Sequence, residues 1–238
     1  MTQVILIHGA WSTGAAWTSV VPALSGAGHA VLAPTLPGHG DDPTPHDGID
    51  VMTYARAMID RLPEDGPVTV VGHSMGGLVI SQMAELAPER INHLIYVAAF
   101  LPRDGQSLLD LIKTQEGPGI QIAVERAGKH STVLNPERAA PILFPDATPA
   151  QQAAALGGLS TQPNRAQTSP VRLTDDRFGR VAKTYILCTQ DRTVTPDLQR
   201  AMIANNTSGD TAVHELDCGH FPQLSATSDL NRLLNSLL

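Results

Sequence analysis

The hydrophobic positions of this chain fall into short continuous runs separated by longer amphipathic stretches. Each run has the length of a strand, and in the stretches apolar residues recur every three or four positions, which is the period of a helix. Continuous apolar strands that alternate with helices are typical of a parallel sheet covered on both faces. We therefore expect an α/β fold. The predicted strands are 4–7, 30–33, 68–71, 94–99, 183–188 and 212–216, and the predicted helices are 17–24, 51–62, 77–86, 196–204 and 228–237.

The alternation stops between residues 101 and 180. This stretch holds helix-like pieces at 106–113 and 148–156, joined by segments rich in Pro and Gly. It is too long for an ordinary loop, since structureless loops longer than about 15 residues are uncommon in compact domains. We interpret residues 1–100 and 181–238 as one α/β core with helices on both faces of a mostly parallel sheet. Residues 101–180 would form a small, mainly helical cap.

The third predicted strand leads directly into the sequence Gly-His-Ser-Met-Gly at residues 72–76, and a predicted helix follows. Strand, Gly-x-Ser-x-Gly and helix is the context of a nucleophile elbow, a turn so tight that the serine is held in a strained conformation. The N-terminus of the following helix favours a negative charge that develops nearby. Ser74 is therefore the candidate nucleophile, and a purely structural turn is the alternative.

A serine nucleophile needs a general base, and the base needs an acid that orients it. Functional groups of a parallel α/β sheet gather at the carboxyl ends of the strands. His220 follows the last predicted strand, and Asp191 follows the strand before it. The chain order Ser74, Asp191, His220 is the order expected with this kind of elbow. Asp104 and Asp217 are weaker candidates for the acid, and Asp217 shares a turn with His220.

Acyl transfer also needs two hydrogen-bond donors for the oxyanion that forms on the substrate. In a nucleophile elbow one donor is the backbone N–H of the residue after the nucleophile, which here is Met75. The other comes from the turn after the first strand, His8-Gly9-Ala10-Trp11, and we choose the N–H of Ala10.

Composition narrows the range of partners. The 238 residues carry a net charge of −7 with no basic run, which argues against nucleic acid and against an anionic membrane surface. No apolar run reaches the length of about 18 residues that suggests a membrane span. The chain enters a strand almost at once, with no secretion signal before it, so we expect a cytoplasmic protein. Its oligomeric state, monomer or homodimer, stays open.

The cysteines and histidines do not suggest a metal site. Cys188 and Cys218 lie in or beside apolar runs and are expected to be buried thiols, although neighbouring strands would also allow a disulfide. His8, His39 and His73 are expected to organise their own loops. The other histidines lack acidic or thiol neighbours at a ligand spacing, so we predict no metal and no cofactor.

Taken together, these motifs resemble the α/β-hydrolase superfamily, and within it the small esterases grouped with plant hydroxynitrile lyases and salicylate methylesterase-like enzymes. The resemblance runs from the first strand to the last helix and is weakest across the cap. It rests on residues 8–11 with Gly14 and Trp17, on 36–40, 72–77 and 99–102, on Asp191 with Pro196 and Gln199, and on Gly219-His220.

Two positions depart from the lyases of that group. Those lyases resemble one another in carrying a threonine where this chain has Gly9, and a lysine where this chain has Phe221. The lysine would handle the charge of cyanide, so cyanohydrin cleavage is not expected here. A serine at position 74 also argues against the dehalogenases and epoxide hydrolases of this superfamily, which use an aspartate.

We therefore expect a serine carboxylesterase that hydrolyses a small, mainly apolar ester through an acyl-enzyme on Ser74. Apolar residues of the cap and of the two motifs are expected to line its pocket. They are Trp11, Leu108, Leu109, Ile112, Phe144 and Phe221. Two alternatives stay open. The same triad could act on a thioester, a lactone or a carbon–carbon bond, or the chain could be a hydrolase-like ligand-binding protein with slow turnover.

Overall fold

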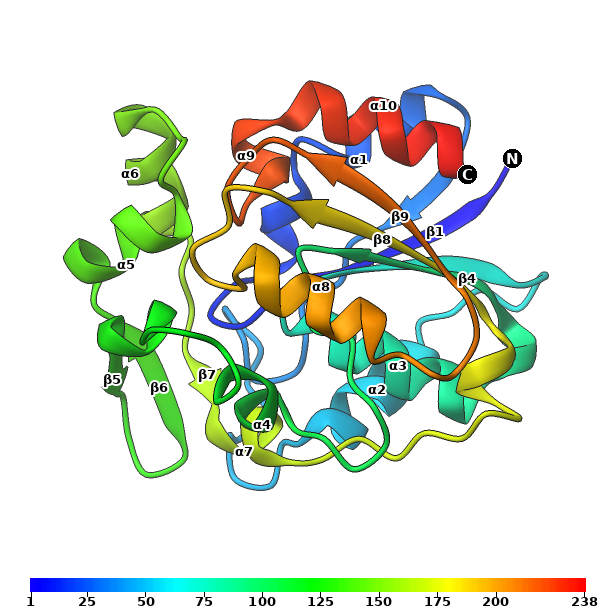
Figure 1. Ribbon diagram of the computed structural model, residues 1–238, viewed down its shortest axis with the longest axis horizontal. Coiled ribbons are helices and arrows are strands. Elements are labelled where there is room, and N and C mark those ends of the chain that lie inside the picture. The colour runs from blue at the N-terminus through cyan, green and yellow to red at the C-terminus, as the bar shows by residue number, and fades with distance from the viewer.

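Six parallel strands form the central sheet of the computed structural model, which describes residues 1–238 (Figure 1). The strands lie in the order β2-β1-β3-β4-β8-β9, so the chain begins inside the sheet, moves to one edge, and then crosses to the other. Their bounds are β1 Gln3–Ile7, β2 Ala30–Leu32, β3 Val68–His73, β4 Ile91–Val97, β8 Ala182–Cys188 and β9 Thr211–Leu216. The predicted α/β fold with a mostly parallel sheet is confirmed.

Alternate side chains of the strands enter two separate cores, because successive residues of a strand point to opposite faces. In β1, Ile5 and Ile7 pack with helices α2, α3 and α8, whereas Val4 and Leu6 pack with η1, α1 and α10. Both faces are therefore covered, as the continuous apolar runs predict. The bounds are η1 Gly14–Trp17, α1 Val21–Gly26, α2 Val51–Ile59, α3 Gly76–Leu86, α8 Pro196–Ala204, α9 Pro222–Ser225 and α10 Thr227–Leu237.

Several predicted elements have different limits in the structure. The helix predicted over 51–62 ends at Ile59, and the strand predicted over 94–99 begins at Ile91. The helix predicted over 17–24 is instead a 3-10 turn, η1, and a separate helix that starts at Val21, with Pro22 in its first turn. Proline is tolerated there because the N–H groups of the first turn have no partner inside the helix. The strand predicted to end at residue 99 ends at Val97, because Ala98 takes a φ of 45°.

Residues 101–180 carry short helices and a small antiparallel sheet that the sequence did not predict. The sheet order is β5-β6-β7, with strands Val124–Arg126, Ser131–Leu134 and Gln162–Pro163. These strands are too short to show a period in the sequence. The helical elements are α4 Leu108–Ile112, η3 Gly119–Ala123, α5 Pro136–Leu143, α6 Pro149–Gly157, α7 Asn164–Thr168 and η4 Phe178–Arg180.

The cap has a small core of its own, and its two ends join the main core. Leu134, Leu143 and Phe144 form an apolar cluster with Trp11, which the first βα turn contributes. Residues near the end of the segment, such as Leu173 and Phe178, pack instead with α2 and α3. The predicted boundaries between cap and core, at residues 101 and 180, therefore stay a prediction.

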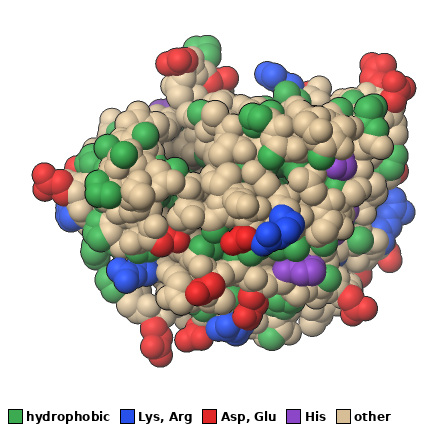
Figure 2. All heavy atoms as spheres, turned by 90° about the horizontal axis from the view of Figure 1, so that it is seen from above, with side chains coloured by type: hydrophobic (Ala, Val, Ile, Leu, Met, Phe, Trp, Pro, Cys, Tyr) green, Lys and Arg blue, Asp and Glu red, His purple; other side chains and the backbone are tan.

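The outer surface mixes polar and apolar side chains. On the face in Figure 2, acidic and basic residues stand singly or in small groups, with hydrophobic ones between them. None of the helices combines the length and the apolar character that a bilayer crossing requires.

Close backbone contact between α3 and the turn after β4 predicts a strict need for glycine at position 77. A Cβ on Gly77 would lie 2.1 Å from the carbonyl oxygen of Phe100. Gly77→Ala should lower the free energy of unfolding in urea by about 3 kcal/mol or more, since two buried backbone segments must separate. Gly157→Ala is the control, because a Cβ there meets nothing within 4 Å. A Gly77→Ala protein as stable as the control would contradict the packing described.

Candidate active site

Ser74 stands in a strained turn between β3 and α3. Its φ is 54°, a left-handed conformation that side chains rarely adopt. A Cβ on Gly72 would lie 2.8 Å from the carbonyl oxygen of Gly76, and a Cβ on Gly76 would lie 2.7 Å from that of Ile7. The two glycines therefore let strand and helix meet, and the turn has the geometry of the predicted elbow.

His220 and Asp191 meet because their strands are neighbours. Cys188, at the end of β8, pairs in register with Leu216, at the end of β9, so the loops that follow lie side by side. His220 Nδ1 is 2.7 Å from Asp191 Oδ2, and the two side chains are 2% and 0% exposed. The structure thus brings together the candidate base and the candidate acid that the order of the strands selected.

The two alternative acids have other partners. The exposed carboxylate of Asp217 accepts hydrogen bonds from Thr189 Oγ1 at 2.8 Å and from Gln190 Nε2 at 3.0 Å. Asp104 accepts the backbone N–H of Leu173 at 2.9 Å. Neither carboxylate is bonded to His220, so Asp191 is the acid that the geometry favours.

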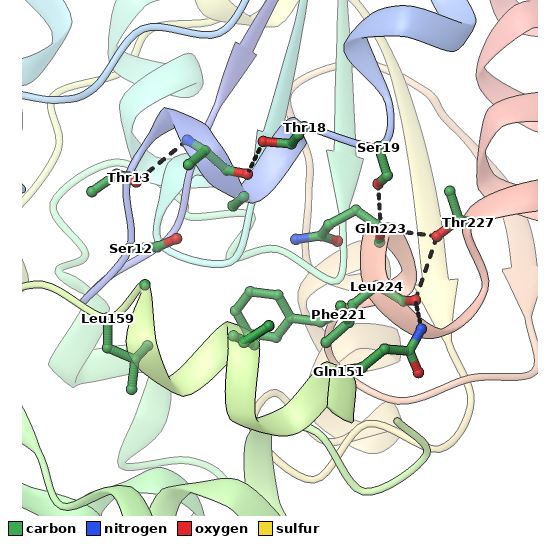
Figure 3. Close-up of a pocket in the computed structure, with 15 residues that line it drawn as sticks. Ser12, Thr13, Thr18, Ser19, Gln151, Leu159, Phe221, Gln223, Leu224 and Thr227 are labelled. Carbon is green, nitrogen blue, oxygen red and sulfur yellow. Dashed lines mark hydrogen bonds between the residues drawn. The ribbon is translucent and has the colours of Figure 1, made fainter. Parts of the chain in front are cut away.

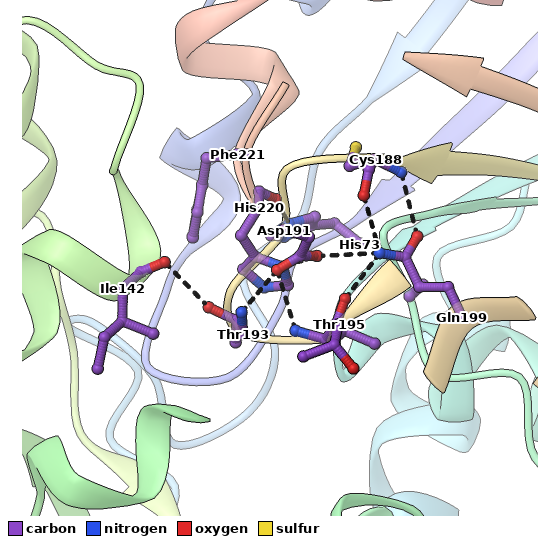
Figure 4. A network of polar contacts seen from close by, with 12 residues as sticks. His73, Ile142, Cys188, Asp191, Thr193, Thr195, Gln199, His220 and Phe221 are labelled. Carbon is purple, nitrogen blue, oxygen red and sulfur yellow. Dashed lines mark hydrogen bonds and ion pairs between the residues drawn. The ribbon is translucent and has the colours of Figure 1, made fainter. Parts of the chain in front are cut away.

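The hydrogen bonds around Asp191 determine which nitrogen of His220 carries a proton (Figure 4). Asp191 Oδ1 accepts the N–H groups of Thr193 at 2.7 Å and Val194 at 3.0 Å. Gln199 Nε2 donates to Val194 O at 2.7 Å and reaches Asp191 Oδ2 at 3.4 Å. With donors on every side, the carboxylate acts as an acceptor, so His220 Nδ1 is the donor. The Nε2 of His220 is then free to accept a proton.

His73 connects the serine turn to the histidine loop. Its Nε2 donates to the backbone carbonyl of His220 at 2.8 Å, and the two rings lie 4.7 Å apart. Ser74 is the next residue and is 7% exposed. Neither Ser74 Oγ nor His220 Nε2 has a hydrogen-bond partner in the protein. The hydroxyl–imidazole bond is therefore not closed, and such bonds often tighten only when substrate binds.

The two predicted oxyanion donors border the serine and are unpaired. A Cβ on Gly9 would lie 2.8 Å from Ser74 Cβ, so the turn that holds Ala10 packs directly on the candidate nucleophile. Met75 immediately precedes the first turn of α3. The N–H groups of Ala10 and Met75 donate to no acceptor within the protein, which leaves both available to a substrate oxygen.

A buried polar network holds the turn after Ala10. Trp11 N–H donates to Gln162 Oε1 at 3.3 Å, and Gln162 Nε2 donates to the Tyr54 hydroxyl at 3.4 Å. Tyr54 in turn donates to His39 Nε2 at 2.9 Å, and His39 Nδ1 donates to the carbonyl of Ser12 at 3.0 Å. Only this sequence of donors satisfies every member. His39 organises its loop as expected, whereas no sequence pattern indicated Tyr54 or Gln162.

Three histidines around this turn are uncharged. Burial lowers the pKa of His8 to about 4. Its Nδ1 donates to Gly9 O at 2.8 Å and its Nε2 accepts Leu36 N–H at 2.9 Å, the bonding of a neutral ring. Burial likewise lowers the pKa of His39 and of His73 well below the ordinary value. They hold backbone as neutral groups.

The predicted pocket residues separate into two sets. Phe221 packs against Phe144 at 4.8 Å and against His220 at 5.3 Å, and Trp11 lies in the same apolar cluster. The other set, Leu108, Leu109 and Ile112, packs with the main core beside α2 and α3. Only the aromatic set touches the histidine segment. The structure also has surface hollows of about 460 and 600 Å³, and neither is lined by Ser74 or His220.

The cap also holds the loops that carry His220 and Asp191. Asp146 Oδ2 accepts the backbone N–H of Gly219 at 2.6 Å and the hydroxyl of Ser225 at 2.7 Å. Thr193 Oγ1 donates to Ile142 O at 3.5 Å. Both loops are thus bonded to one cap segment, residues 142–146, which sequence reasoning missed because no local pattern marks it.

The two cysteines lie behind the pair of loops. Cys188 and Cys218 are buried, as expected, and their sulfurs are 3.6 Å apart as free thiols. That no metal or cofactor takes part stays a prediction.

The chain matches known proteins over nearly its whole length. A sequence model of the "Alpha/beta hydrolase family" matches residues 4–233. "Methylesterase 7" of Arabidopsis thaliana is 28% identical over 245 residues, which cover 96% of this chain and 92% of the relative. "Alpha-hydroxynitrile lyase" of the same plant is 28% identical over 254 residues, covering 98% and 95%. The crystal structure of a pyrethroid hydrolase from Sphingobium faniae has a TM-score of 0.89 at 27% identity, covering 99% and 96%.

The buried neutral histidines predict a loss of stability in acid. His8 takes up a proton near pH 6.5 when unfolded but only near pH 4 when folded. Between these values the unfolded state binds more protons, so the free energy of unfolding must fall as the pH falls from 6.5 to 4. The shift of His8 alone corresponds to about 3 kcal/mol, and His39 and His73 act in the same direction. Urea unfolding at pH 7, 6 and 5 measures this. A free energy of unfolding that does not change with pH would contradict it.

Proposed function

This chain belongs to the alpha/beta hydrolase family, and from that premise we propose that it is a serine carboxylesterase acting on a small, mainly apolar ester. Its relatives include proteins named as esterases, so it is an ester-hydrolysing enzyme at the level of class. The observation that carries the finer proposal is the 2.7 Å bond between His220 Nδ1 and Asp191 Oδ2, beside the strained serine turn. A cytoplasmic location, expected from the sequence, is part of the same proposal.

The first half of the reaction forms an acyl-enzyme. Ser74 Oγ attacks the acyl carbon while His220 Nε2 takes its proton, so that a tetrahedral oxyanion forms. Asp191 holds the imidazole with its proton on Nδ1 and stabilises the imidazolium. His220 then gives the proton to the departing alcohol oxygen as the carbon–oxygen bond breaks. The acyl group remains on Ser74.

The backbone amides of Ala10 and Met75 stabilise the oxyanion. Both N–H groups are unpaired within the protein, so no hydrogen bond has to break before they act. The network through Gln162 and Tyr54 holds the turn next to Ala10. One such donor typically contributes about 2.7–4 kcal/mol to the stability of the transition state.

The second half of the reaction releases the acid. His220 Nε2 takes a proton from a water molecule, which attacks the acyl carbon and regenerates the oxyanion. Collapse of the oxyanion returns the proton to Ser74 Oγ and frees the carboxylic acid. The reaction needs no metal, cofactor, nucleic acid or membrane, and the only partner we propose is the ester itself.

The surroundings of His220 favour an apolar ester. Phe221 directly follows the base, and its ring lies 4.6 Å from His73 and 4.8 Å from Phe144. No cation stands at position 221 to accept the charge of cyanide. Hydrolysis therefore fits this site better than the reaction named for the lyase relative.

Removal of the Ser74 hydroxyl should abolish both the initial burst and the steady turnover of ester cleavage. With p-nitrophenyl acetate, the wild-type protein should release a burst of nitrophenol followed by steady turnover. Ser74→Ala should show neither phase, and Ser236→Ala, an exposed serine on α10, should behave as wild type. Turnover that persists in Ser74→Ala would rule out Ser74 as the nucleophile. A burst without later turnover would indicate a ligand-binding protein rather than an esterase.

Separate replacement of Asp191 and of Asp217 tests which of the two carboxylates orients His220. Asp191→Asn should lower kcat by about 10⁴-fold, because the amide no longer selects the Nδ1 tautomer of His220. Asp217→Asn should keep kcat within a factor of about 3 of wild type, because that carboxylate bonds only to Thr189 and Gln190. Circular dichroism establishes that both variants are folded. Similar losses in the two variants would contradict the assignment.

A further inference from the structure

The peptide unit between Gly9 and Ala10 carries the proposed oxyanion donor, the Ala10 N–H, and its carbonyl is bonded to the core. His8 Nδ1 donates to Gly9 O at 2.8 Å, and His8 Nε2 accepts the N–H of Leu36 at 2.9 Å. The carbonyl and the N–H of a trans peptide point in opposite directions, so this bond directs the Ala10 N–H away from the His8 ring. The core thus fixes the peptide unit that precedes the Cα of Ala10.

Trp11, on the other side of Ala10, has a strained backbone. Its φ is 53°, in the left-handed region that residues with a side chain rarely adopt. Ser74 and Ala98 are the only other residues besides glycine with a positive φ. A conformation of this kind persists only where the surrounding structure holds it in place, and such residues gather at functional sites. The contacts of Trp11 should therefore identify what holds the turn in its shape.

All three polar groups of Trp11 are bonded to the cap. Its backbone N–H donates to Gln162 Oε1 at 3.3 Å, and its indole Nε1 donates to Thr132 Oγ1 at 3.1 Å. Its carbonyl accepts the N–H of Ser160 at 2.8 Å. The three partners belong to cap segments more than 120 positions away along the chain. Contacts with the cap, and not the local sequence, therefore hold Trp11 in the left-handed conformation.

The small cap sheet brings two of these partners together. Thr132 of β6 and Gln162 of β7 are paired in register, so their side chains stand next to each other on one face of the sheet. One accepts the indole N–H of Trp11 and the other its backbone N–H. Gln162 is fully buried, and its Nε2 also donates to Pro163 O at 2.9 Å, which fixes the direction of its acceptor oxygen. Pairing of the two cap strands thus creates a pair of acceptors that fits Trp11.

We propose that the cap sheet completes the oxyanion hole, with Gln162 and Thr132 as positioning residues for the N–H of Ala10. The cap fixes the peptide unit after Ala10 through Trp11, and the core fixes the unit before it. The donor then keeps its direction beside the serine turn, so no rearrangement is needed when the oxyanion forms. This inference rests on the proposed esterase reaction, to which it adds no chemical step.

A pair of esters that differ in one atom tests the role of Gln162. p-Nitrophenyl acetate forms an oxyanion, whereas its thiono analogue, with C=S in place of C=O, places the charge on sulfur, a weak hydrogen-bond acceptor. Gln162→Met should lower kcat/KM for the oxygen ester by about tenfold or more, mainly through kcat, and for the thiono ester by less than about threefold. A general folding defect would instead lower both rates alike. The pH at which kcat/KM rises should stay that of the wild type, because the variant leaves His220 and Asp191 unchanged.

Gln151→Met is the matched control for this variant. Gln151 also connects the cap to the core, because its Nε2 donates to Leu224 O at 2.9 Å (Figure 3), but it has no bond to Trp11. Its ratio of the oxygen-ester rate to the thiono-ester rate should equal that of the wild type. Equal losses for both esters in Gln162→Met, or the same ratio in the two methionine variants, would overturn the proposal.

A second variant tests the other acceptor at a half-buried position, where a defect in folding is less expected. Thr132→Val keeps the shape of the side chain and removes the acceptor of the indole N–H, so it should reduce the same ratio by about threefold or more. Thr161→Val, beside Gln162 but without a bond to Trp11, should not. A wild-type protein that cleaves neither ester would refute the esterase proposal and this one with it. Intact turnover that depends on Ser74, with unchanged ratios in Gln162→Met and Thr132→Val, would refute only the role of the cap sheet.

Discussion

The close approach of three backbone segments around Ser74 is the constraint on which the rest of the structure depends. Glycine at positions 9, 76 and 77 lets the first βα turn, α3 and the turn after β4 come together without side chains between them. These contacts place the serine turn beside the free amides of Ala10 and Met75. A methyl group added at Gly9 would push the first βα turn away from Ser74. One added at Gly76 or Gly77 would push α3 away from β1 or from the turn after β4.

The many hydrogen bonds around Ser74 also fix which group is the donor and which is the acceptor. The carboxylate of Asp191 receives only donors, and the network from Trp11 to Ser12 can be satisfied with only one placement of its protons. Burial keeps the supporting histidines neutral, so they act as fixed donors and acceptors rather than as charges. Against this paired background, the groups left without partners next to Ser74 are the ones to which the proposed mechanism assigns a role with the ester.

Local sequence patterns predicted those candidate site residues that lie in a recognisable turn or at the end of a strand. Apolar runs located the strands, the Gly-x-Ser-x-Gly turn located Ser74, and the ends of neighbouring strands located Asp191 and His220. The supporting residues come from elsewhere: Gln162 contacts Trp11 across 151 positions and Asp146 contacts Gly219 across 73. Such contacts follow from how the cap folds over the core, and a short irregular segment has no period that predicts them. The small cap sheet was missed for the same reason.

The cap contributes to the site as a support and not only as a cover. Gln162 accepts the N–H of Trp11 in the turn that holds Ala10, and Asp146 bonds to the segment that carries His220. If the cap moved away as a rigid body, it would break both bonds and expose the apolar cluster that Trp11 forms with Leu134, Leu143 and Phe144, at a cost of about 25 cal/mol for each Å² of apolar surface exposed. Smaller movements of the Phe144 and Phe221 rings break no hydrogen bond of this kind, because these rings contact other aromatic rings and form no hydrogen bond themselves. For the proposed ester substrate, entry past these aromatic rings with the cap backbone in place is therefore the less costly route, and it keeps the candidate catalytic groups aligned.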